Sequence, residues 1–165
     1  MKKKLTLVIA AILLMSGCGA DTSGSGDDTL SSQKTEQKTE VTAAEILDKL
    51  MASGKAEKMT ARADFGSEDF NSMCDLMYGV TLDSLTDGGV IFEETGQSAD
   101  EVSLLKGADE SVLKSRAEQR AAVYDGYAPV EAEKARNALV FTYEGFSVLV
   151  IADNAEEIKD IITKE

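Results

Sequence analysis

Residues 146–151 place the strongest limit on the fold, because nearly every position in Phe-Ser-Val-Leu-Val-Ile is apolar. Successive side chains of a strand point to opposite faces of a sheet. A strand that is apolar on both faces therefore belongs in the centre of a sheet that is covered on both sides. The rest of the chain has to supply neighbouring strands and a layer for each face.

Two other segments have the alternation of apolar and polar residues that is typical of strands. One covers residues 90–93, after a turn predicted at Asp87-Gly88-Gly89. The other covers residues 139–143, and a tight Glu144-Gly145 turn leads from it into the apolar run. Residues 101–106 are ambiguous: their length and alternation favour a strand that pairs with residues 90–93, whereas the alternative is the beginning of a helix.

Helix caps and helical spacing predict five helices. They are expected to begin after the caps Thr42, Ser67, Asp109 and Asn154 and at Pro129, and the first two are expected to end at Gly54 and Gly79. Thr42 with Glu45, and Asn154 with Glu157, have the spacing of a capping box. The resulting order, ααββααββα, predicts an α+β fold in which helices pack against a small antiparallel sheet of about four strands in two hairpins.

The first residues have the layout of a secretory signal, with lysines at positions 2–4, an apolar run at 5–15 and the small pair Ser16-Gly17. The run would rise only about 17 Å as a helix, against a hydrocarbon core of roughly 30 Å. A small pair directly before Cys18 resembles the bacterial lipobox. That resemblance implies cleavage between Gly17 and Cys18 and lipid attachment at Cys18, whereas the alternative is an ordinary signal with an incidental cysteine.

These features divide the chain into three parts: a signal peptide at 1–17, the lipidated cysteine with a disordered linker at 18–40, and a single domain at 41–165. The linker consists almost entirely of small and polar residues, which cannot bury enough apolar surface to offset ordering entropy. The acyl chains, at about 0.8 kcal/mol per buried methylene, would hold the mature protein on the extracytoplasmic face of the cell membrane.

Charge and composition exclude several classes of function. Loss of the three signal lysines leaves 14 Lys and Arg against 30 Asp and Glu, a net charge of -16. Such a chain lacks the clustered cations that nucleic acids require. The chain contains no histidine, which removes histidine-based catalysis and histidine metal ligands. Cys74, the cysteine left after lipidation, has the setting of a buried, inert thiol. No cofactor is expected.

The acidic pairs Glu93-Glu94 and Asp100-Glu101 flank the turn after residues 90–93 and could surround a calcium ion or serve as an acid/base pair. Neither pair has the residue order of a dedicated calcium loop. A solvated acidic rim is therefore the favoured interpretation. Phosphate-binding and nucleophile motifs are also missing from the sequence. The sequence identifies no catalytic residue and no metal ligand.

Tyr124 and Tyr127 lie on either side of a predicted turn between two helices. Tyrosine is common at interfaces because its ring offers rigid, amphipathic contact area. One hypothesis assigns this turn to a partner-binding surface. In the alternative, both rings cover the end of the core.

Short motifs appear in a fixed order after the signal: Leu-Met-Tyr-Gly at 76–79, Tyr127 with Pro129 and Glu131, Asn137-Ala138, and Leu-Val-Ile-Ala-Asp at 149–153. In these motifs the chain resembles the Firmicutes lipoprotein family known as domain of unknown function 4358. The resemblance implies a Gram-positive surface location and a βαβ-rich α+β domain. It implies no activity, cofactor or catalytic residue.

The sequence thus predicts a lipid-anchored, non-enzymatic module that binds another component of the cell envelope, most simply a protein. A small-ligand receptor or transporter-accessory lipoprotein is the alternative, and a hydrolase of wall polymers is the third possibility. The anchor provides the contact with the membrane, and nucleic acid is not an expected partner.

Overall fold

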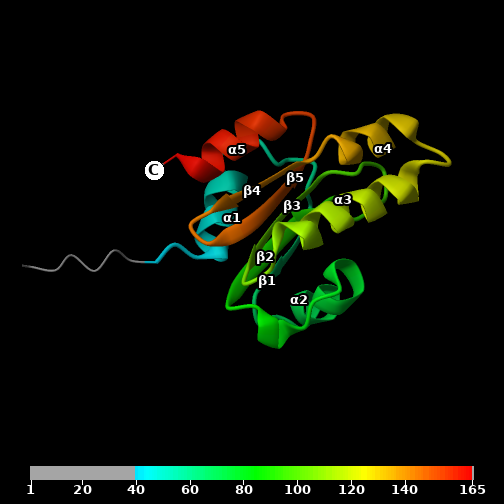
Figure 1. The fold of residues 1–165 in the computed structure, drawn as a ribbon. Coiled ribbons are helices and arrows are strands. Elements are labelled where there is room, and N and C mark those ends of the chain that lie inside the picture. Colours follow the sequence, from blue (N-terminus) through cyan, green and yellow to red (C-terminus); the bar gives the residue numbers. More distant parts are fainter. Residues whose placement is uncertain (1–39, 165) are drawn as a thin grey trace, which may run out of the picture. The chain divides into compact units, whose positions relative to one another are not determined.

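The structure is a computed structural model that describes residues 40–164. Its centre is a five-stranded, fully antiparallel sheet in the order β1-β2-β3-β5-β4 (Figure 1). The strands are β1 (Ala61–Asp64), β2 (Asp87–Phe92), β3 (Glu101–Lys106), β4 (Leu139–Tyr143) and β5 (Phe146–Ile151). The α-helices are α1 (Ala43–Ala52), α2 (Glu68–Met73), α3 (Glu110–Tyr124), α4 (Pro129–Arg136) and α5 (Ala155–Thr163). The predicted α+β class is confirmed.

The predicted signal peptide, the lipid-attachment residue Cys18 and nearly all of the predicted linker lie outside the described residues. Across residues 40–164, every helix is too short or too polar to span a bilayer.

Strand β5 lies between β3 and β4 and is buried along its whole length, as its apolar sequence predicts. Leu149 and Ile151 belong to the core under α3 and α4, whereas Val148 and Val150 belong to the core under α1 and α5. The sheet is therefore covered on both faces by two separate layers of apolar side chains. The first layer also includes α2 and the one-turn π-helix η1 (Cys74–Tyr78), where Cys74 is buried.

The sheet has one strand more than the sequence predicts. β1, with the sequence Ala-Arg-Ala-Asp, pairs antiparallel with the outer edge of β2 and was missed because it has no run of large apolar residues. The observed order is therefore αβαββααββα, when η1 and the short 3-10 helix η2 (Leu82–Ser84) are left aside. Residues 101–106 form a strand, β3, which pairs with β2 and β5 and removes the helical alternative.

The turn predicted at Asp87-Gly88-Gly89 is wrong, because these residues begin β2. A Cβ added at Gly88 would lie 2.6 Å from Cζ of Phe70 in α2, and one added at Gly89 would lie 2.8 Å from Cδ1 of Leu47 in α1. The two glycines face opposite sides of the sheet. Their absent side chains let a helix approach closely on each face.

Most helix boundaries agree with the caps. Thr42 and Glu45 form the complete capping box, and the Asp109 carboxylate accepts a hydrogen bond from the backbone N–H of Ser111. The second box is wrong, since the Asn154 side chain makes no cap and instead donates to the carbonyl of Lys55. The predicted second helix is divided into α2 and η1, and it ends at Gly79 as expected.

Candidate functional site

The two tyrosines of the predicted turn have opposite environments. Tyr124, at the end of α3, is 1% exposed, and its hydroxyl donates to the carbonyl of Ser98. Tyr127, in the turn between α3 and α4, is 63% exposed. The centroids of the two rings are 5.4 Å apart. Tyr124 thus belongs to the core, as in the structural alternative, whereas Tyr127 is available at the surface.

Two further apolar side chains close to Tyr127 in the sequence are also exposed. Val123 is 59% exposed and Val130 is 77% exposed, so three of the six large exposed apolar residues in the described part of the chain lie within positions 123–130. We call Val123, Tyr127 and Val130 the α3–α4 turn surface. Exposed apolar groups that concentrate in this way are typical of interaction sites.

The loop between β2 and β3 is folded around the carboxylate of Glu93. That carboxylate accepts hydrogen bonds from the backbone N–H groups of Thr95 (2.8 Å), Gln97 (2.9 Å) and Ser98 (3.2 Å), and from the Thr95 hydroxyl. The hydrogen bond from the Thr95 side chain, followed by those from the backbone, lowers the pKa of Glu93 to about 2. The predicted solvated rim is wrong at this position, because Glu93 is buried within its own loop.

Glu93 should make the stability of the protein depend on pH in a defined window. Because its pKa is about 2 in the fold and near 4.5 when unperturbed, its contribution is complete above about 4.5 and is lost as the pH falls towards 2. The difference in unfolding free energy between wild type and Glu93→Gln should therefore shrink across this window in urea titrations. Glu94→Gln, at the exposed neighbouring carboxylate, is the matched control and should cost less stability than Glu93→Gln at neutral pH. A constant difference for Glu93→Gln would contradict the assignment.

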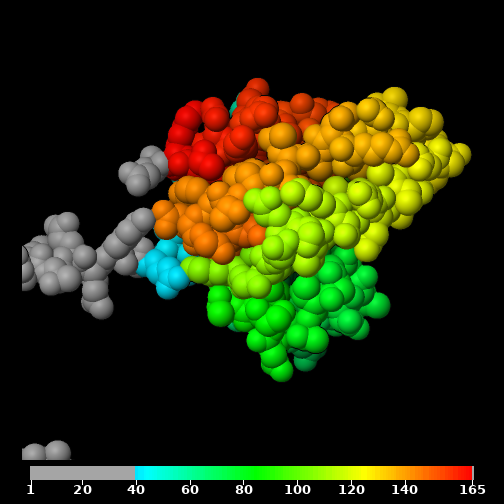
Figure 2. All heavy atoms as spheres, viewed as in Figure 1, coloured from blue at the N-terminus to red at the C-terminus, as the bar shows by residue number. Residues whose placement is uncertain are grey.

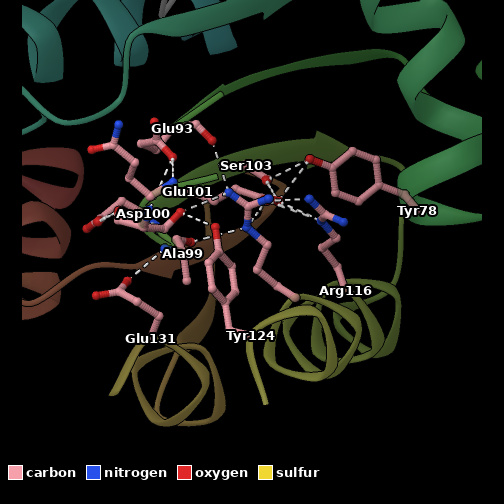
Figure 3. Close-up of polar contacts among 12 residues, drawn as sticks. Tyr78, Glu93, Ala99, Asp100, Glu101, Ser103, Arg116, Tyr124 and Glu131 are labelled. Carbon is pink, nitrogen blue, oxygen red and sulfur yellow. Dashed lines mark hydrogen bonds and ion pairs between the residues drawn. The ribbon is translucent and has the colours of Figure 1, made fainter. Parts of the chain in front are cut away.

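Helices α3 and α4 hold the same loop from below (Figure 3). The Arg120 guanidinium of α3 donates to the carbonyls of Glu93 (3.1 Å) and Ser98 (3.3 Å). The Glu131 carboxylate of α4 accepts a hydrogen bond from the backbone N–H of Ala99 at 2.7 Å. The loop is thus a fixed element that is tied to two helices beyond it in the chain.

Lys134 of α4 binds three carboxylates at the edge of this loop. Its ammonium lies 3.1 Å from Asp100, 2.9 Å from Glu131 and 3.3 Å from Asp153, and its side chain is 7% exposed. Burial opposes the charge of Lys134, but the hydrogen bonds to Glu131 and Asp100 outweigh it and raise the pKa of the lysine. Asp100 is therefore neutralised by a lysine of the same chain.

The deepest polar cluster lies between the sheet and α3 and centres on Glu101 of β3, which is fully buried (Figure 3). The Arg116 guanidinium of α3 contacts both carboxylate oxygens, through Nε at 3.0 and 3.2 Å and Nη2 at 2.6 Å. The hydroxyls of Ser103 (3.0 Å) and Tyr78 (3.3 Å) also donate to Oε1. Burial and the charge of Glu101 raise the pKa of Tyr78, so its hydroxyl stays protonated.

These positions change the interpretation of the acidic pairs. Glu93, Asp100 and Glu101 are buried, and Glu94 is the exposed member of the two pairs. Glu101 binds an arginine side chain and Asp100 binds a lysine side chain. The calcium hypothesis would instead have both carboxylates bind a metal ion. Within residues 40–164, no three carboxylate or thiol side chains gather in a way that could hold a metal ion. The hydroxyls of Ser103 and Tyr78 belong to buried residues and bond Glu101 and each other.

A shallow hollow of about 520 Å³ lies on the outer side of the fixed loop. It is lined by Lys58, Thr60, Glu93, Thr95, Gln97, Ser98 and Glu131. Most of these residues offer hydroxyl, amide or carboxylate groups, so the hollow suits a small polar molecule better than an apolar one.

Comparison of the chain with known protein families, with curated proteins and with solved structures finds no match.

Proposed function

We propose that the chain is a lipid-anchored, extracytoplasmic protein that acts as a non-enzymatic binding module of the cell envelope. The observation that carries this proposal is the α3–α4 turn surface, with Val123, Tyr127 and Val130 exposed. The partner is proposed to be an envelope protein, because apolar and aromatic side chains of this kind form the centres of protein interfaces. Membership in the family known as domain of unknown function 4358 remains part of the proposal.

The place where the chain enters the domain supports this assignment. Glu40, at the start of the described chain, forms an ion pair with Lys106, the last residue of β3. Tyr124, at the end of α3, donates a hydrogen bond to the loop that leads into Glu101, the first residue of β3. The α3–α4 turn surface is therefore at the opposite end of the sheet from the point where the chain enters, as Figure 1 also shows. A tether that joins the domain at Glu40 would therefore attach at the end of the sheet away from that surface.

A photo-crosslinking experiment on intact cells tests both parts of the proposal. A benzophenone side chain in place of Tyr127 should give a discrete cross-linked species in the membrane fraction. The matched control replaces Met51 of α1, an apolar side chain that is 45% exposed on another surface, and should give none. Equal cross-linking from both positions, or none from either, would contradict the assigned surface.

The anchor is tested in the same cells with Cys18→Ser. Loss of the thiol removes the site of acylation, so the precursor should stay uncut and the cross-link at position 127 should be lost. If Cys18→Ser were processed and retained on membranes like the wild type, the lipid-anchor part of the proposal would be wrong. The interaction surface would then need another explanation for its location.

A receptor for a small ligand is the second candidate function. It is favoured by the hollow of about 520 Å³ on the loop that Glu93, Arg120 and Glu131 hold in place. A loop that is already fixed loses little entropy when a ligand binds. A polar ligand bound there should slow hydrogen exchange in the loop and leave cross-linking at position 127 unchanged. These two measurements separate the receptor function from the protein-binding function.

A further inference from the structure

A second apolar face lies on the segment that connects β1 to β2. Leu76 of η1 is 82% exposed, the largest value among the large apolar side chains of residues 40–164. Met73 lies three residues before Leu76, a spacing that places side chains on the same face of a helix, and Met77 follows Leu76 directly. Both methionines are half-buried against the core. We call Met73, Leu76 and Met77 the Leu76 face. It belongs to the green part of the surface in Figure 2.

The charged side chains of the segment that carries this face are all of one sign. Residues 65–86 contain four acids and no Lys or Arg, and all four carboxylates are exposed. They are Glu68, Asp69, Asp75 and Asp83. None of these side chains makes an ion pair or hydrogen bond with another described residue.

The cations nearest to this segment along the chain are already paired. Arg62 binds Asp48 and Asp64, and Lys106 binds Glu40. The four carboxylates of residues 65–86 therefore have no ion-pair partner among the described residues. A surface of this sign repels anionic lipid head groups and nucleic acids and attracts cations.

We propose that the Leu76 face is a docking site for a positively charged, amphipathic segment of a partner protein. Apolar side chains of the partner would cover Leu76 and the two methionines, and its Lys or Arg residues would reach the four carboxylates. Methionine suits such a contact because its flexible, polarisable side chain adapts to different partners. The proposal is independent of the α3–α4 turn surface, which shares no residue with it.

A binding titration with a defined probe tests this site. The full chain, purified from membranes in a detergent with neutral head groups, is titrated against a fluorescein-labelled 14-residue peptide of Leu and Lys arranged as an amphipathic helix. Fluorescence anisotropy measures the dissociation constant. The comparison peptide has Ser at every Leu position and the same charge, and it should bind much more weakly because it cannot cover Leu76.

Matched triple variants separate a local site from general attraction. Asp69→Asn/Asp75→Asn/Asp83→Asn should weaken binding of the Leu/Lys peptide roughly tenfold, as expected for three partly screened charge contacts. The control, Glu57→Gln/Glu94→Gln/Glu118→Gln, removes the same charge from three exposed, unpaired carboxylates elsewhere and should weaken binding less than about twofold. Leu76→Ser should weaken binding without changing the net charge.

Three outcomes would overturn the proposal. Equal weakening by both triple variants would mean that net charge alone attracts the peptide. Unchanged binding by Leu76→Ser, or equal binding of the Ser peptide, would mean that the apolar face takes no part. Circular dichroism and thermal unfolding establish that each variant remains folded. Because Val123, Tyr127 and Val130 are unaltered throughout, failure here leaves the cross-linking result at position 127 to be judged separately.

Discussion

Glu101→Gln is expected to lower the unfolding free energy by about 3 to 5 kcal/mol, because it removes one partner of a buried ion pair. The substitution keeps the size of the side chain and removes its charge. Arg116, which is 8% exposed, would then remain buried beside a neutral amide that no longer offers two charged oxygens. Urea unfolding of the two proteins, followed by circular dichroism, measures the difference.

A double variant separates the loss of charge from the loss of packing. Glu101→Leu with Arg116→Met replaces the pair by apolar side chains, a change that is often neutral or stabilising by about 1 to 4 kcal/mol in buried ion pairs. Much of the stability lost in Glu101→Gln should therefore return, since the hydroxyls of Tyr78 and Ser103 can still bond each other at 2.8 Å.

An exposed ion pair provides the matched control. Glu110→Gln removes the partner of Lys114 on the surface of α3 and should cost less than about 0.5 kcal/mol. If Glu101→Gln were as mild as Glu110→Gln, the network around Glu101 would not stabilise the fold, and its assignment as a structural cluster would be wrong.

The sequence predicted elements whose signals are local. Thr42 and Asp109 identified helix starts through their own caps, and the apolar run of residues 146–151 identified a strand covered on both faces. Strand β1 has no such signal. Its four residues, Ala61–Asp64, include two alanines and an ion-paired Arg62, and their extended form depends on pairing with β2.

Gly88 and Gly89 show how a local signal can mislead. A pair of glycines after an aspartate is typical of a turn. In the structure these residues begin a strand, because Phe70 and Leu47 from two helices occupy the space on its two faces. The neighbour that requires Gly88 is about 18 residues away in the chain, and the one that requires Gly89 is about 42 residues away. The spacing of residues within the motif does not identify either neighbour.

The buried polar clusters were missed for the same reason. Glu101 was interpreted as part of a solvated rim because its partner, Arg116, lies 15 residues further on in another element. One signal was available in α3. Arg116 and Arg120 fall at helical spacing among Leu113, Ala117 and Tyr124, which places two cations on a buried face and predicts buried carboxylates opposite them.

Phe70→Ala is the second substitution with a large expected effect, about 3 to 5 kcal/mol of unfolding free energy. Phe70 is fully buried and is the buried residue of α2, so the substitution leaves a cavity at the contact that holds this helix to the sheet. Phe65→Ala is the control, because Phe65 is 38% exposed and meets Phe70 edge-on with ring centroids 5.9 Å apart. It should cost about 1 kcal/mol.

The close approach of Phe70 to Gly88 adds a sharper test. Gly88→Ala alone should cost about 1 to 3 kcal/mol, because its Cβ would lie 2.6 Å from Cζ of Phe70. In the Phe70→Ala background that clash is absent, although the carbonyl of Leu104 remains 3.0 Å from the added Cβ. The two costs should therefore not add, and the double variant should be more stable than their sum by about 1 kcal/mol. Strict additivity in urea unfolding would contradict the packing of α2 against Gly88, and with it the position of the Leu76 face, which begins at the last residue of α2.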